Sequence, residues 1–80
     1  MITFEKFLKE EVNDYIKDLI LKSIKQGKIE NKFREELIFN RYSLEFLFEE
    51  SKVIIYDDVF SEDKPLELEL DKFVTVLSGL

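Results

Sequence analysis

Cysteine, histidine and tryptophan are missing from this 80-residue chain, and glycine and proline together contribute only three residues. Without cysteine, the chain has neither a disulfide bond nor a thiol nucleophile. Without histidine, it lacks the usual general base and the commonest zinc ligand. Neither glycine lies in a known type of phosphate-binding loop. We therefore expect no enzymatic activity, no metal site and no cofactor.

Long hydrophobic runs are missing as well, because no stretch of about 18 apolar residues is available to span a membrane. The first residues include Glu5 and lack the basic and then apolar segments of a signal peptide. We therefore expect a cytoplasmic protein without a membrane segment. The apolar fraction of 45%, which includes eight phenylalanines, is enough for one small core. Residues 1–80 are predicted to form a single domain.

The first part of the chain has the pattern of one long helix from Phe4 to Gln26. Thr3 is a suitable N-cap, apolar residues recur at helical spacing, and Gly27 is expected to end the helix. Such a helix is about 35 Å long, whereas a strand of six residues covers about 20 Å. The helix is therefore expected either to overhang the sheet or to break.

Three apolar residues of this helix lie outside its main apolar stripe: Ile20, Leu21 and Ile24. We favour a structure in which a later segment covers them over one in which they form a surface for self-association. The segment that follows is ambiguous. Apolar residues recur there at every fourth position, which favours a short helix over residues 31–37 with Asn31 as its N-cap. The run Leu37–Phe39 is also compatible with the start of the first strand.

The stretch from Tyr42 to Leu70 alternates apolar and polar residues, which is typical of strands with one buried face. It divides into strands at residues 42–49, 53–60 and 65–70. A tight turn separates the first two strands, and the polar loop Ser61–Lys64 separates the last two. Three consecutive strands of this kind predict an antiparallel sheet.

Asp71 is expected to cap a last helix. The apolar stripe of that helix is predicted to contain Phe73, Val76, Leu77 and Leu80. The predicted fold class is α+β, with a long N-terminal helix packed on a three-stranded antiparallel sheet and a short C-terminal helix. The predicted core consists of ten apolar residues: Phe4, Leu8, Tyr15, Leu19, Leu44, Phe46, Ile55, Leu68, Phe73 and Leu77.

Charge is distributed unevenly along the chain. Residues 1–41 contain nine bases and eight acids, whereas residues 42–80 contain three bases and ten acids, for a net charge of −6 overall. A concentrated negative field attracts basic partners and repels nucleic acid. The bases of the first half are interspersed with acids and do not form a basic face. We therefore expect a protein partner with a basic surface and no nucleic acid.

The acids near Tyr56 form the predicted partner-binding site, because tyrosine is enriched at interfaces and charge pairs matter most near an interface centre. Asp58 is expected on the same strand face as Tyr56, and Asp57 on the opposite face. Reversing the charge of Glu10 or Glu11 is expected to change binding little. The predicted partner-binding residues are Tyr56, Asp57, Asp58, Glu62, Asp63, Glu67 and Glu69. The acidic loop lacks the alternation and central glycine of a calcium loop, which favours a solvated surface over a metal site.

Four features follow one another in residues 54–80. They are an aliphatic strand that runs into Asp57-Asp58, an acidic loop, the strand Pro65–Leu70 and a helix that opens with Asp71-Lys-Phe73. This arrangement resembles the small bacterial immunity proteins of polymorphic and contact-dependent toxin systems. The resemblance implies tight one-to-one inhibition of a cognate toxin, often a nuclease.

Two classes of function follow as hypotheses. In the first, the chain is a non-catalytic inhibitor: either an immunity protein that neutralises a toxin through its acidic surface, or a phage-encoded mimic of nucleic acid that blocks a host defence protein. In the second, it is a small structural or adaptor module that self-associates through Ile20, Leu21 and Ile24. We expect a monomer rather than a dimer.

Overall fold

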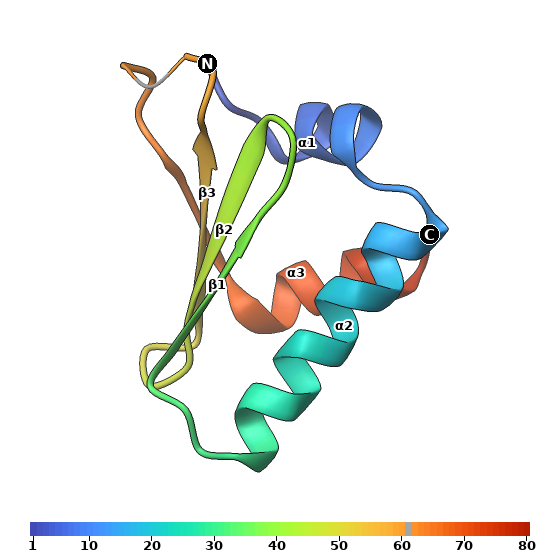
Figure 1. Cartoon of the computed structure of the whole chain (residues 1–80), viewed down its shortest axis with the longest axis vertical. Helices are drawn as coiled ribbons and strands as arrows, with labels where there is room; N and C mark the ends of the chain where they lie inside the picture. The colour runs from blue at the N-terminus through green and yellow to red at the C-terminus, as the bar shows by residue number, and fades with distance from the viewer. Residues whose placement is uncertain (61) are drawn as a thin grey trace.

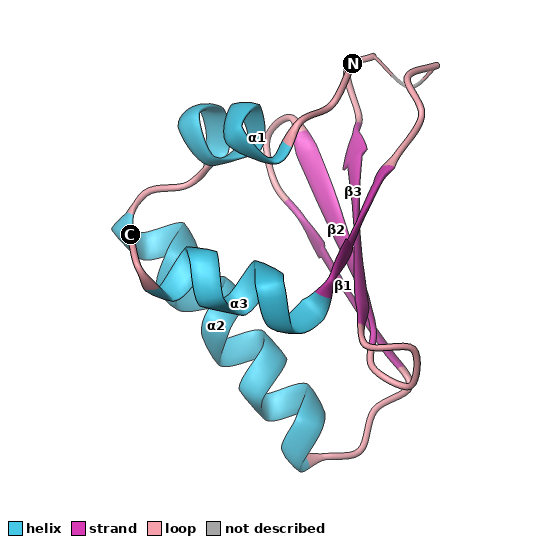
Figure 2. Ribbon diagram, turned by 180° about the vertical axis from the view of Figure 1, so that it is seen from behind, coloured by secondary structure: helices cyan, strands magenta, loops and turns pink. Residues whose placement is uncertain are grey.

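The computed structural model describes residues 1–60 and 62–80, and it places three helices and a four-stranded antiparallel sheet in that part of the chain. In chain order the elements are α1 (Phe4–Glu11), α2 (Asp14–Ile29), β1 (Arg34–Ile38), β2 (Tyr42–Leu47), β3 (Lys52–Asp57), β4 (Leu66–Glu69) and α3 (Leu70–Ser78). The strands lie in the order β1-β2-β3-β4. All three helices lie on one side of the sheet (Figure 1 and Figure 2). The α+β class is confirmed, but the sheet has a fourth strand and the N-terminal region has two helices.

The predicted long N-terminal helix breaks after its second turn. Thr3 is the N-cap of α1, as expected, and its Oγ1 accepts a hydrogen bond from the amide of Lys6 at 3.1 Å. The backbone is extended at Val12 and Asn13. The Oδ1 of Asn13 then accepts a hydrogen bond from the amide of Ile16 at 2.9 Å, so Asn13 is the N-cap of α2. Asparagine is among the best N-cap residues, and it begins a new helix here.

The break changes which residues of the second helix are buried. Tyr15, which was predicted in the core, is 73% exposed. Ile20 and Ile24 are buried instead, and Leu21 is half-buried against the core. The expectation that another segment covers these three residues is confirmed, and self-association through them is contradicted by their burial.

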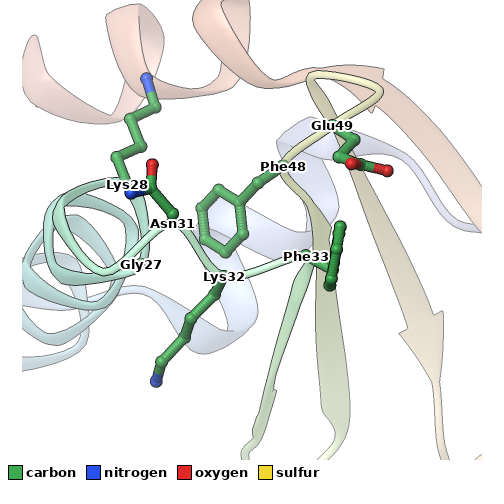
Figure 3. Close-up of a pocket in the computed structure, with 7 residues that line it drawn as sticks. All are labelled: Gly27, Lys28, Asn31, Lys32, Phe33, Phe48 and Glu49. Carbon is green, nitrogen blue, oxygen red and sulfur yellow. The ribbon is translucent and has the colours of Figure 1, made fainter.

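Gly27 does not end α2, which continues to Ile29. Asn31 follows the helix in the left-handed conformation, with φ of 53°. It does not cap the second helix that had been predicted. Gly27 has a packing role instead. The Phe48 ring lies against the backbone of α2 at this position, where a Cβ on residue 27 would come within 2.7 Å of Phe48 Cε2 (Figure 3). Close approach of a ring to a helix backbone requires the missing side chain.

Residues 34–38 form strand β1 and not the predicted short helix. Glu36 lies opposite Glu45 and Leu37 opposite Leu44 in the antiparallel register with β2. Leu37 is half-buried on the helix side, whereas Arg34 is exposed. The helix predicted from the four-residue spacing was wrong because pairing with β2 decides the structure of this segment. Tertiary contacts often override local propensity in this way.

Aromatic side chains join the helices to the sheet. Phe7 meets Tyr42 edge to face at a centroid distance of 5.4 Å, and Phe4 stacks on Phe73 at 5.4 Å. Of the predicted core, the structure buries Leu44, Phe46, Ile55, Phe73 and Leu77 and half-buries Phe4, Leu8, Leu19 and Leu68. The core therefore lies between the sheet and all three helices.

The last helix begins at Leu70, and its N-cap lies two residues before the predicted cap Asp71. Its N-cap is Glu69, without a side-chain hydrogen bond, and Asp71 lies in the first turn. Val76 and Leu80 are exposed, so the predicted stripe was wrong at these two positions. The buried face of α3 consists of Leu70, Phe73 and Leu77.

The second predicted strand is also shorter than expected, because β3 ends at Asp57 and not at Phe60. The turn between β2 and β3 contains Ser51 in the left-handed conformation, with φ of 53°. Ser61, the first residue of the predicted polar loop, lies outside the described residues.

We predict that Gly27→Ala destabilises the protein, although alanine normally stabilises a helix by about 1 kcal/mol relative to glycine. The added methyl group displaces the Phe48 ring from α2, and overpacking of this kind costs about 1–3 kcal/mol. The measurement is the free energy of unfolding in urea.

Gly79→Ala is the matched control. A Cβ there would lie 3.6 Å from the nearest carbonyl oxygens, which is ordinary contact. This variant is expected to unfold like the wild type. If Gly27→Ala is as stable as Gly79→Ala, the Phe48 contact does not constrain residue 27.

Candidate functional site

The face of the sheet opposite the helices is uncovered by any described element (Figure 2). Strand alternation places eleven residues on it: Arg34, Glu36, Ile38, Ser43, Glu45, Leu47, Lys52, Ile54, Tyr56, Glu67 and Glu69. We call this surface the open face. Its central row crosses all four strands, and three of the four positions in that row are glutamates. The row runs from Glu36 through Glu45 and Ile54 to Glu67.

Two bases partly compensate these acids. Arg34 pairs with Glu36 at 3.0 Å and also with Glu45, and Lys52 Nζ lies 2.8 Å from Glu67 Oε1. The hydrogen bond from Arg34 holds the pKa of the Glu45 carboxyl below its usual range, with a further contribution from the Tyr56 hydroxyl. Tyr56 donates to Glu45 Oε1 at 2.9 Å. The tyrosine ring is thereby fixed on the open face.

An acidic notch of about 250 Å³ adjoins the open face beyond the end of β3. Its lining consists of Glu36, Ser43, Tyr56, Asp57, Asp58, Asp63 and Pro65. Four of these residues are acids and none is a base. The Ser43 hydroxyl donates to the Asp58 carboxylate, and the Asp58 amide donates to the Arg41 carbonyl at 2.7 Å. Asp63 pairs with the N-terminal ammonium at 3.3 Å.

The seven predicted site residues are distributed over the notch, the open face and the loop. Tyr56, Asp57, Asp58 and Asp63 line the notch together. Glu67 and Glu69 lie on the part of the open face that β4 contributes. Glu62 is exposed in the loop and does not line the notch.

Asp57 differs from the other predicted residues because its carboxylate is already engaged within the chain. It is 6% exposed, and its Oδ2 accepts a hydrogen bond from Arg41 at 3.1 Å. Its Oδ1 accepts from the amides of Val59 and Phe60 at 3.0 and 3.1 Å. Asp57 and Tyr56 do point to opposite faces, as expected. The role of Asp57 is to turn the chain after β3, which positions Asp58.

The same hydrogen bonds set the titration of Asp57. Donation by Arg41 is the main cause that lowers the pKa of its carboxyl, and the two backbone amides add to the effect. The Arg41 guanidinium also lies 5.2 Å from the centre of the Phe60 ring. The loop after β3 is therefore attached to Arg41 through both polar and aromatic contacts.

Two acids of α1 also contact Arg41 or its neighbour Tyr42, and with Asp57 they form what we call the Arg41 junction. Glu10 pairs with Arg41 at 3.1 Å and accepts a hydrogen bond from the Tyr42 hydroxyl. Glu11 Oε1 accepts from the amides of Arg41 and Tyr42 at 3.1 and 3.3 Å. Burial, followed by the bond to Glu10, raises the pKa of Tyr42 to about 12. Glu10 and Glu11 hold α1 to the sheet, so they are unsuitable as surface controls.

Sequence reasoning did not include Glu36 and Ser43 in the site. Glu36 was missed because its segment was predicted as a helix. Ser43 is an isolated serine in a strand, and nothing local indicates that it bonds to Asp58, fifteen residues away. Only the register of β1, β2 and β3 brings these residues to Tyr56.

Within residues 1–60 and 62–80, no three acidic side chains are placed to share a metal ion. No helix in this part of the chain is long and apolar enough to cross a membrane. No family model, curated protein or solved structure matches the chain.

We predict that Asp57→Asn lowers the free energy of unfolding near pH 6. The native pKa of Asp57 is lowered from its ordinary 3.8, so its ionised form stabilises the fold above that pH. This stabilisation is lost as the pH falls through the lower native pKa. The difference between wild type and Asp57→Asn should therefore shrink below about pH 4. Urea unfolding at several pH values measures it, and a difference independent of pH would contradict the role given to Arg41.

Proposed function

We propose that this chain is a non-catalytic protein-binding inhibitor, of the immunity-protein kind, whose open face and acidic notch bind a basic surface of a toxin. The observation that carries the proposal is the density of acids around a fixed tyrosine on an uncovered sheet. Apart from Asp57, whose carboxylate is engaged by Arg41, six carboxylates lie on the open face or at the notch beside Tyr56, against the two bases Arg34 and Lys52. These acids are Glu36, Glu45, Asp58, Asp63, Glu67 and Glu69.

A protein partner fits this surface better than a nucleic acid does. Carboxylates repel phosphates, whereas a lysine- or arginine-rich surface meets complementary charge and is steered to it at a high rate. A nuclease that binds phosphates presents such a basic surface, which supports the finer proposal that the toxin is a nuclease. The proposed site of action is the cytoplasm.

The rigidity of the site favours tight binding. The acids of the open face stand on paired strands, and the Ser43 and Tyr56 hydroxyls already hold Asp58 and Glu45. Side chains that are ordered before binding lose less entropy when the complex forms. Tyr56 supplies an aromatic anchor beside the charges, as at many interface centres.

The test uses the protein encoded beside this chain's gene as the candidate toxin. The test variant is Glu67→Lys/Glu69→Lys, in which two exposed acids of β4 are reversed. We expect its association rate constant to be lower than that of the wild type by a factor of about ten or more. We also expect this rate constant to depend less strongly on salt. Surface plasmon resonance at low and physiological ionic strength measures both quantities. Asp58→Lys, at the notch, should have an effect in the same direction.

Glu5→Lys/Asp18→Lys is the control, because it changes the net charge equally at exposed positions of α1 and α2. It should associate almost like the wild type and still protect cells that express the toxin. If this control loses binding while the β4 variant keeps it, the helical side and not the open face binds the partner. If neither variant changes association, the acidic surface is not the binding site.

A further inference from the structure

The two edge strands of the sheet differ in how they are protected. β4 has only four residues and follows Pro65. The Leu70 amide donates to the Ser51 carbonyl at 2.8 Å, so the alternate residues Glu67 and Glu69 present their backbone groups at the free edge. At a short edge whose two outward-facing residues are both acids, a second copy of the same edge is repelled.

β1 is the less protected edge. The Phe48 amide donates to Phe33 O at 3.0 Å and the Phe39 amide to Tyr42 O at 2.9 Å, so the odd-numbered residues of this segment bond to β2. In an antiparallel ladder alternate residues bond to opposite sides. The N–H and C=O groups of Arg34 and Glu36 therefore face away from the sheet, at the free edge.

Exposed apolar side chains flank this edge. Phe33 precedes β1 and is 71% exposed, and Ile38 ends it and is 70% exposed. Phe33 lines the cavity beside Gly27 (Figure 3). Ile38 lines another cavity, of about 540 Å³, together with the exposed Tyr15. Unpaired backbone groups between exposed apolar residues are the features that pair with an added strand.

We propose that β1 pairs antiparallel with β1 of a second copy, in the register that places Arg34 opposite Glu36. The two-fold symmetry of such a dimer forms this pair twice, with opposite charges facing each other each time. The same register places Phe33 of each copy opposite Leu37 of the other. At the two-fold axis, Glu35 lies opposite Glu35 of the other copy. Lys32 Nζ lies 3.0 Å from Glu35 Oε2 within each copy and compensates this charge.

The neighbouring registers match less well. A register centred on Glu36 places this residue opposite its counterpart in the other copy, and a register centred on Arg34 does the same for Arg34. In both registers like charges face each other. A register centred on Leu37 places Glu36 opposite the apolar Ile38. A register centred on Ile38 runs past the end of β1 to Asn40, which lies in the turn before β2. The Arg34–Glu36 register thus keeps opposite charges together within the strand.

The dimer does not depend on the proposed inhibitor function. It joins two four-stranded sheets into one of eight strands, in which the open faces form one continuous surface. The sequence predicted a monomer and offered self-association only through Ile20, Leu21 and Ile24, whereas this edge belongs to a segment that was predicted to be helical.

The test compares Arg34→Glu and Glu36→Arg. Each variant alone places like charges opposite each other twice, and its dimer dissociation constant should rise about tenfold or more. A mixture of the two variants restores opposite charges at both positions and should form heterodimers. The variants have net charges of −8 and −4, derived from −6 for the wild type. Both stay acidic, so overall attraction does not explain their pairing. Analytical ultracentrifugation measures the association.

Two further measurements make the test specific. Amide hydrogen exchange of the wild type should show protection of Arg34 and Glu36 that increases with concentration. Glu67→Arg, on the β4 edge, should dimerise like the wild type, and Arg34→Glu/Glu36→Arg in one chain should regain self-association. The proposal is overturned if the wild type stays monomeric at millimolar concentration. It is equally overturned if the mixed variants do not prefer each other, or if Glu67→Arg abolishes the dimer.

Discussion

The contacts of Arg41 connect the parts of the molecule on which the acidic notch depends. Its guanidinium bonds to Asp57 at the end of β3 and to Glu10 of α1, and its backbone bonds to Glu11 and Asp58. One residue in the hairpin between β1 and β2 therefore orients a helix, a strand end and the loop that follows. A buried carboxylate is tolerated only when it is paired and hydrogen-bonded. Asp57 meets that condition through Arg41 and two backbone amides. The burial of Asp57 and the position of Arg41 therefore depend on each other.

The second constraint is that all three helices cover the same face of the sheet. Large aromatic residues pack between this face and the helices, and Phe7, Phe46 and Phe73 are fully buried there. The other face has no such cover, and its strand positions carry charges alternating with Ile54 and Leu47. Acids at this density repel each other, and the pairs formed by Arg34 and Lys52 offset only part of that repulsion. A basic partner would relieve the remainder, which links the architecture to the proposed function.

The accuracy of the sequence predictions varied with how local the determining interactions are. The alternation of β2 and β4 is a local pattern, and it correctly indicated that Phe46 faces the helices. The cap at Thr3 is equally local. Residues 31–37 were misassigned because apolar residues recur there at every fourth position, although β2 recruits the segment as a strand. Asp57 was grouped with surface acids because nothing near it in sequence indicates that Arg41 is its partner.

Composition and short-range pattern by themselves determined the α+β class, the acidic second half, the absence of histidine and cysteine chemistry, and the opposite orientation of Tyr56 and Asp57. These properties depend on residue type or on neighbours within a few positions. The tertiary structure decided where the first helix breaks, which strand forms the exposed edge, and which acid is buried. It also decided that Gly27 accommodates the Phe48 ring. Each of these outcomes depends on residues that are distant in sequence and meet only when the sheet forms, because burial and strand pairing are set by the packing of the whole chain and not by any one segment.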